Sequence, residues 1–73
     1  MRKTNNNPSY TFTKRGIYYF TRLVPFDVQH HYKQRRIIQS LRTRSTKDAA
    51  KTARMLSLRL ETYWHELRLE QQE

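Results

Sequence analysis

The spacing of apolar and polar positions in the first third of the chain predicts two short β-strands. Tyr10 and Phe12 alternate with threonines, which is the spacing of a strand with one buried face. The run Ile17–Val24 is rich in β-branched and aromatic residues and predicts a second strand. Pro25 should end that strand, because proline has no N–H to donate to a ladder.

The connection between these strands predicts a tight hairpin turn. It reads Lys14-Arg15-Gly16, and Gly16 is the only glycine in the chain, at a position where such a turn needs a positive φ. A third strand is expected over Arg36–Leu41, with Ile37, Gln39 and Leu41 on one face and Ile38, Ser40 and Arg42 on the other.

Two weaker patterns lie between the second and third strands. Pro25–Tyr32 is compatible with a single helical turn that has Asp27 near its N-terminus. Lys33–Arg36 is a basic connector. Residues 1–8 are polar, carry two cations and end in proline, so we expect a flexible basic tail.

The remainder of the chain predicts one long helix, over about residues 46–71. Ser45 with Asp48 three residues later resembles a weakened capping box, and Thr46 is the competing N-cap. Seven apolar residues repeat at intervals of three and four and fall within about 120° of arc. They are Ala49, Ala53, Leu56, Leu60, Tyr63, Trp64 and Leu67.

These elements predict an α+β fold, a three-stranded antiparallel sheet packed on the long C-terminal helix, within one domain over residues 9–73. Three strands are not stable alone, and the helix stripe is the available cover for one sheet face. The other face should remain exposed. A coiled-coil seam is the alternative reading of the stripe, but three uncovered strands favour core packing. The helix is longer than the sheet, so its last turns should extend past it.

Charge is distributed unevenly along the chain. Residues 1–47 hold eleven Lys and Arg and one acid, whereas residues 48–73 hold four Lys and Arg and five acids. Arginines outnumber lysines ten to five, and the guanidinium fork matches phosphates and guanine edges. The balance indicates a polyanionic partner, and a solvated basic surface without a specific partner is the alternative.

Composition excludes several other classes. The chain has no cysteine, so a disulfide scaffold and a thiolate metal site are excluded. No apolar run approaches the roughly 18 residues of a membrane span. We therefore expect a cytoplasmic protein that does not bind membranes. A chain this short also leaves no interior volume for an enclosed substrate pocket, so we expect neither catalysis nor a cofactor.

Several segments, in their order and spacing, resemble the start of phage and genomic-island integrases, which are tyrosine recombinases. These are Lys14–Phe20, Arg22–Asp27, Ser40–Thr43 and Thr46–Ala50. The similarity covers about residues 10–60. This sequence has Arg42 where those proteins usually have glycine, so the turn there is expected to differ. It also has Thr21 and Leu23 where arginines are common, so fewer phosphate contacts are expected from that strand.

The resemblance implies an accessory N-terminal domain of a larger recombinase encoded by a bacterium or phage, ahead of core-binding and catalytic domains that are its possible partners. It also implies a sheet that lies in the major groove of double-stranded DNA. The residues expected to contact DNA are Lys14, Arg15, Tyr19, Thr21, Arg22, Arg35, Arg36, Ile38, Ser40, Arg42 and Arg44. RNA binding, or ribosome association, and protein docking are the alternatives.

Two other constellations carry less weight. Adjacent His30 and His31 suggest a metal site, but a tetrahedral site needs further ligands that neither cysteines nor a nearby acidic cluster supplies. The five tyrosines suggest a recombinase nucleophile. A nucleophilic tyrosine needs a large scaffold of arginines and histidine around a phosphate, which this chain lacks.

Overall fold

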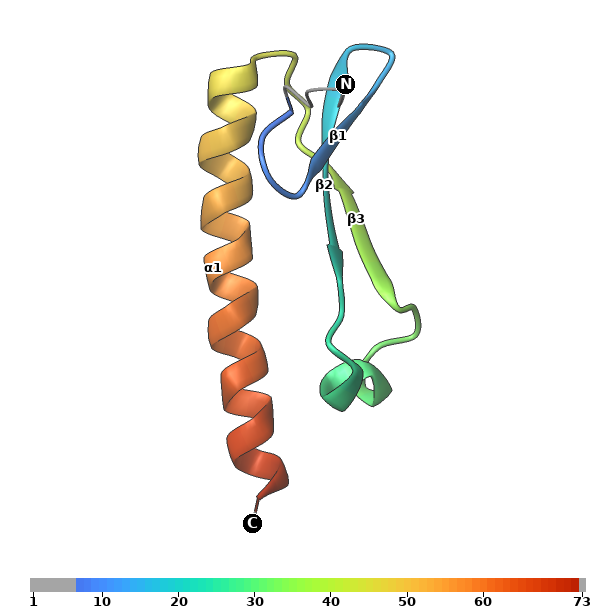
Figure 1. The fold of residues 1–73 in the computed structure, drawn as a ribbon, viewed down its shortest axis with the longest axis vertical. Helices are drawn as coiled ribbons and strands as arrows, with labels where there is room; N and C mark the ends of the chain where they lie inside the picture. The colour runs from blue at the N-terminus through green and yellow to red at the C-terminus, as the bar shows by residue number, and fades with distance from the viewer. Residues whose placement is uncertain (1–6, 73) are drawn as a thin grey trace, which may run out of the picture.

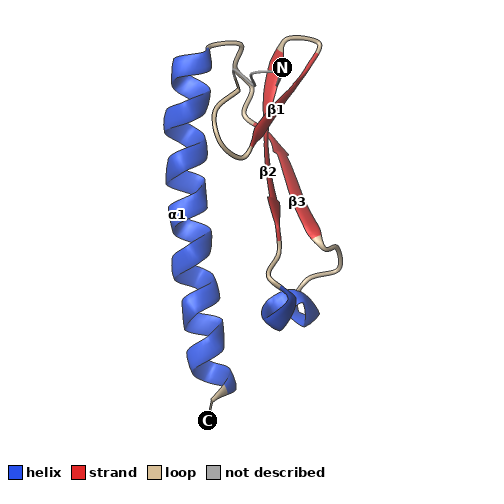
Figure 2. Ribbon diagram, in the orientation of Figure 1, coloured by secondary structure: helices blue, strands red, loops and turns tan. Residues whose placement is uncertain are grey.

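The computed structural model describes residues 7–72 and confirms the predicted α+β fold (Figure 1, Figure 2). Its strands form one antiparallel sheet in the order β1-β2-β3, and a single long helix packs beside it. The elements are β1 (Thr11–Lys14), β2 (Ile17–Leu23), the 3₁₀ helix η1 (Phe26–His31), β3 (Arg36–Ser40) and α1 (Thr46–Gln71). Most of the predicted basic tail lies outside the described residues.

The β1–β2 turn uses two residues with positive φ. Arg15 has φ 55° and Gly16 has φ 82°, and Lys14 pairs with Ile17 across the turn. Two-residue hairpin turns of type I′ need positive φ at both central positions, because only then does the turn twist match the strands. The positive φ predicted for Gly16 is therefore confirmed, and Arg15 shares that conformation.

Ser45 is the N-cap of α1. Its hydroxyl accepts a hydrogen bond from the Asp48 N–H at 3.1 Å, as in a capping box. The Ser45 N–H donates to Thr43 Oγ1, and this local hydrogen bond replaces the second hydrogen bond of a capping box. The competing residue, Thr46, instead shares a 2.6 Å hydrogen bond with the Tyr18 hydroxyl, which ties the start of α1 to β2.

Strand periodicity divides β2 into two sets of side chains, and the more apolar set is expected to face the helix. Tyr18, Phe20 and Val24 are buried. On α1 the stripe is only partly correct: Ala49, Ala53, Trp64 and Leu67 are buried, Leu56 and Leu60 are half-buried, and Tyr63 is 48% exposed.

The position of α1 over the sheet explains that exposure. Its backbone approaches β1, β2 and η1 but not β3, so the β3 side of the helix has no close cover. An open groove lies there instead. It is lined by Phe20, Ile37, Gln39, Leu56, Arg59, Leu60 and Tyr63.

The second half of α1 packs on η1, a contact that the sequence pattern did not predict. Val24 and Val28 form a buried cluster with Trp64 and Leu67 of α1. The Trp64 indole N–H donates to the Tyr32 hydroxyl at 2.9 Å, so this large buried side chain has its polar group satisfied. The helix does extend past the sheet as expected, and η1 lies beside part of the overhang (Figure 1).

Candidate nucleic-acid interface

One side of the sheet has no helix over it, and we call it the open face. Strand register defines it: Tyr19 pairs with Phe12 on β1 and with Ser40 on β3, and Thr21 pairs with Ile38. Their neighbours in sequence, Tyr18 and Phe20, point into the core. The open face comprises Phe12, Lys14, Ile17, Tyr19, Thr21, Leu23, Arg36, Ile38 and Ser40.

Side-chain contacts on the open face are consistent with this register. The rings of Phe12 and Tyr19 stack with centroids 5.2 Å apart and planes 14° from parallel. The Arg36 guanidinium donates to Thr21 Oγ1 at 3.2 Å, so this cation lies across the face rather than away from it. Sequence reasoning missed Phe12, although its alternation with threonines was the available signal.

At the hairpin end of the open face, the β1–β2 turn and the β3–α1 loop bring four cations to one end of the domain. Lys14, Arg15, Arg42 and Arg44 are all exposed. Arg44 Nη1 donates to the Arg15 carbonyl at 3.1 Å, which holds the loop against the turn. A Cβ on Gly16 would lie 2.5 Å from that same guanidinium nitrogen, so glycine also makes room for Arg44.

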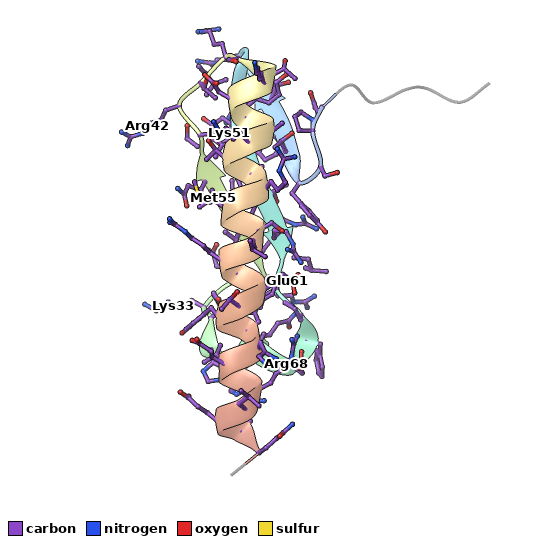
Figure 3. All side chains as sticks on the ribbon, turned by 90° about the vertical axis from the view of Figure 1, so that its left-hand side faces the viewer. Lys33, Arg42, Lys51, Met55, Glu61 and Arg68 are labelled. Carbon is purple, nitrogen blue, oxygen red and sulfur yellow. The ribbon has the colours of Figure 1, made fainter. Side chains whose placement is uncertain are left out.

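The structure changes the account of Arg42. The regular strand ends at Ser40, and Arg42 has a φ of 56°, so period-two alternation does not extend to it. The backbone of Tyr18 forms hydrogen bonds on either side of Arg42. The Tyr18 carbonyl accepts from the Leu41 N–H, and the Tyr18 N–H donates to the Thr43 carbonyl. Arg42 therefore lies in a bulge, where its N–H donates to Ser40 Oγ, and its side chain projects away from the body (Figure 3).

Arg22 lies on the helix side, so it does not belong to the open face. Its guanidinium donates to Ser57 Oγ at 2.6 Å and to Glu61 Oε2 at 2.8 Å, and its side chain is 11% exposed. It also lies over the rings of Tyr10 and Trp64, at 4.3 and 5.0 Å from their centroids. This arginine joins sheet and helix, and we remove it from the proposed DNA contacts.

At the other end of the open face lies a second group of exposed cations, Lys33, Arg35 and Arg36. They follow η1 and precede or begin β3. The Arg35 carbonyl accepts from the Val24 N–H at 2.7 Å, which continues the β2–β3 pairing and anchors this connector. β2 has seven residues, so the two ends of the face are about 20 Å apart. Sequence reasoning had left out Lys33, the connector's first cation.

Charge is divided between the two layers of the fold. Residues 7–45 hold eight Lys and Arg and a single acid, Asp27. That carboxylate is bound by both Nε and Nη2 of Arg68 on α1, and this hydrogen bonding is the main cause that lowers the pKa of Asp27. The other acids of the described chain, Asp48, Glu61, Glu66 and Glu70, all lie on α1. The open face thus carries cations and no carboxylate.

The adjacent histidines contact each other and the end of α1. The rings of His30 and His31 lie 4.2 Å apart, and His31 Nε2 lies 3.2 Å from Gln71 Oε1 at the end of α1. Within residues 7–72 no three His, Asp or Glu side chains gather as metal ligands would.

A second open groove runs between the N-terminal segment and α1. It is lined by Pro8, Ser9, Tyr10, Ala50, Arg54, Ser57, Leu58 and Glu61.

Comparison with known proteins gives one family. The family model described as "Domain of unknown function (DUF6538)" matches residues 10–69, which include all five elements except the last two residues of α1. Searches of the curated proteins and of the solved structures gave no match. Among the described residues, no helix has the length and apolar character needed to cross a membrane.

Proposed function

We propose that this chain, which belongs to the DUF6538 family, binds double-stranded DNA through the open face of its sheet. The observation that carries the proposal is the separation of charge between the layers. Cations flank both ends of a sheet face that bears no carboxylate, while the acids lie on the helix or pair with it. A polyanion would meet stronger attraction on the sheet side, because the acids of α1 nearly balance the cations of that helix.

The dimensions of the face suit a duplex. The outer strands of a three-stranded sheet lie about 10 Å apart, against about 12 Å for the width of the B-DNA major groove. With cations about 20 Å apart along the strands, the two ends of the face would contact different phosphates while the middle faced the bases.

Residue roles follow from position. Lys14, Arg15 and Arg44 at the hairpin end would hold phosphates, as would Arg35 and Arg36 at the other end. Tyr19, Thr21, Ile38 and Ser40 would face base edges. The long side chain of Arg42 extends from the β3 edge, where a guanidinium would bind guanine or a phosphate.

The biological setting that we propose is an accessory domain of a site-specific tyrosine recombinase that does not itself catalyse strand cleavage. The similarity of residues 10–60 to the start of phage integrases supports this role. The residue pattern also supports it at Arg42, because the positive φ there is a conformation that glycine, the usual residue in those integrases, adopts without strain.

Fluorescence anisotropy with a labelled 30-base-pair duplex tests the proposal. If four to six phosphates are neutralised, log K should fall against log salt with a slope of about −4 to −5 between 50 and 200 mM salt. The double variant Lys14→Ala/Arg36→Ala should reduce the steepness of that slope by about two, at one unit per lost phosphate contact.

The matched control is Lys51→Ala/Arg54→Ala, which removes two exposed cations from α1 and should leave binding nearly unchanged. Duplex RNA and single-stranded DNA serve as competitors. A flat salt dependence, or a larger loss in the helix control than in the sheet variant, would contradict the proposal. Tighter binding to RNA would favour the alternative role in RNA binding.

A further inference from the structure

The open face also exposes two large aliphatic side chains, one within β3 and one at the end of β2. Ile38 is 59% exposed and Leu23 is 53% exposed, although both lie in regular strands. Ile38 pairs with Thr21, and Leu23 pairs with Arg36, so Ile38 and Leu23 are diagonal neighbours on one face and within reach of each other. We call these two residues and the Thr21 methyl group the apolar patch.

The apolar patch is not explained by folding. The core lies on the other side of the sheet, where Phe20, Val24 and Trp64 are buried. Arg36 lies opposite Leu23 and its guanidinium reaches across the patch to Thr21 Oγ1, while the stacked Phe12–Tyr19 pair borders the patch toward the hairpin end. An apolar patch on a face with cations at both ends fits a partner that is anionic on its outside and has an apolar group in its groove.

Duplex DNA has one such group in its grooves. The C5 methyl of thymine lies on the floor of the major groove, between two phosphate backbones, and the minor groove has no counterpart. Phosphates offer no apolar contact and deoxyribose is the same at every position, so a sequence-dependent contribution from Ile38 and Leu23 would come from base edges.

We infer that the apolar patch recognises thymine methyl groups, so that the domain prefers A·T pairs at the base positions that the patch contacts. This inference rests on the proposed function and goes beyond it by naming a base and the residues that recognise it. It assigns the sequence preference to aliphatic contacts as well as to arginine, and it commits the sheet to the major groove.

The test removes only the methyl groups. Two hairpin duplexes of alternating sequence, one of dA and dT and one of dA and dU, differ in nothing but the thymine methyl. One buried methyl contributes about 0.8 kcal/mol, which converts to about a fourfold change in Kd. The wild-type chain should therefore bind the thymine duplex about four times more tightly for each methyl that it covers.

The variants locate the contact. Ile38→Ser and Leu23→Thr should each lower the ratio of the two affinities toward one, mainly by weakening binding to the thymine duplex. Both positions are exposed, so far-UV circular dichroism should show unchanged folding. Leu58→Ser is the matched control, because Leu58 is 67% exposed on α1, and it should keep the wild-type ratio.

The outcomes separate the two claims. Tight binding to both duplexes with a wild-type ratio near one would overturn methyl recognition and leave DNA binding standing. A ratio above two that Ile38→Ser and Leu23→Thr do not change would overturn the assignment to the apolar patch. Failure to bind either duplex at 50 mM salt would overturn the inference together with the proposed function.

Discussion

Replacing Arg42 with glycine should make the domain more stable while it weakens DNA binding. Arg42 has φ 56°, a left-handed conformation in which Cβ crowds the following carbonyl. The conformation costs a residue with a Cβ about 1–2 kcal/mol, and glycine does not pay this cost. Glycine loses about 0.5–1 kcal/mol through its greater freedom in the unfolded chain. The net gain of glycine over alanine at this position should be about 0.5–1 kcal/mol.

Comparing the glycine and alanine variants isolates the free-energy cost of the positive φ at position 42. Arg42→Ala and Arg42→Gly both delete the guanidinium, and only the second relieves the positive φ. For a domain of this size, the difference corresponds to about 2–8 °C in Tm. Thermal unfolding followed by far-UV circular dichroism measures it. Both variants should lose the same DNA affinity, by about 1–3 kcal/mol at a site where Arg42 contacts guanine.

Lys51 provides the matched control. It is exposed in the interior of α1, where glycine should be about 1 kcal/mol less stable than alanine. The difference in stability between the glycine and alanine variants should therefore have opposite signs at positions 42 and 51. An Arg42→Gly variant that melts at or below Arg42→Ala would refute the strain argument, because it would mean that the left-handed conformation at this position costs nothing.

Three further changes test other parts of the structure. Gly16→Ala should destabilise the domain by about 1 kcal/mol, because alanine is strained at this positive φ and its Cβ would displace Arg44. Urea unfolding measures the loss of stability, and an unchanged midpoint would contradict the type I′ turn. Arg22→Ala should lower the urea midpoint, because it removes two hydrogen bonds to α1, but it should leave the salt slope of DNA binding unchanged; a shallower slope would return Arg22 to the interface. Asp27 has a lowered pKa in the folded state because of its hydrogen bonds with Arg68, so its contribution to stability is present above the unfolded pKa, about 3.9, and is lost as pH falls through the folded value. Asp27→Asn should therefore reduce the acid sensitivity of unfolding between pH 5 and 2.5, and an unchanged pH profile would count against this ion pair.

Local patterns predicted the elements and much of their orientation. Alternation in Ile17–Val24 places Tyr18, Phe20 and Val24 on one side, and they are buried. The three- and four-residue repeat from Ala49 to Leu67 predicts the helix, and Ser45 begins it. These features depend on residues within one or two turns or strand repeats of one another, so they can be read without knowing the rest of the fold.

Arg22 shows where local patterns fail. It shares the buried register of β2, but its partners Ser57 and Glu61 are 35 and 39 residues away. Only the packing of α1 on β2 brings them together. Tyr63 is the reverse case, because its place in the helical repeat predicts burial and α1 leaves the β3 side uncovered.

For the candidate interface, the sequence by itself determined the charge asymmetry and the parity of each strand, which puts Ile38 with Ser40 on one side of β3 and Tyr19 with Thr21 on one side of β2. These follow from composition and from the two-residue repeat of a strand. Tertiary structure decided which cations border that face, the bulge that turns Arg42 outward, and the cover that η1 provides for Trp64. Those features depend on where the long helix crosses the sheet and on how segments distant in sequence meet, which no local repeat specifies.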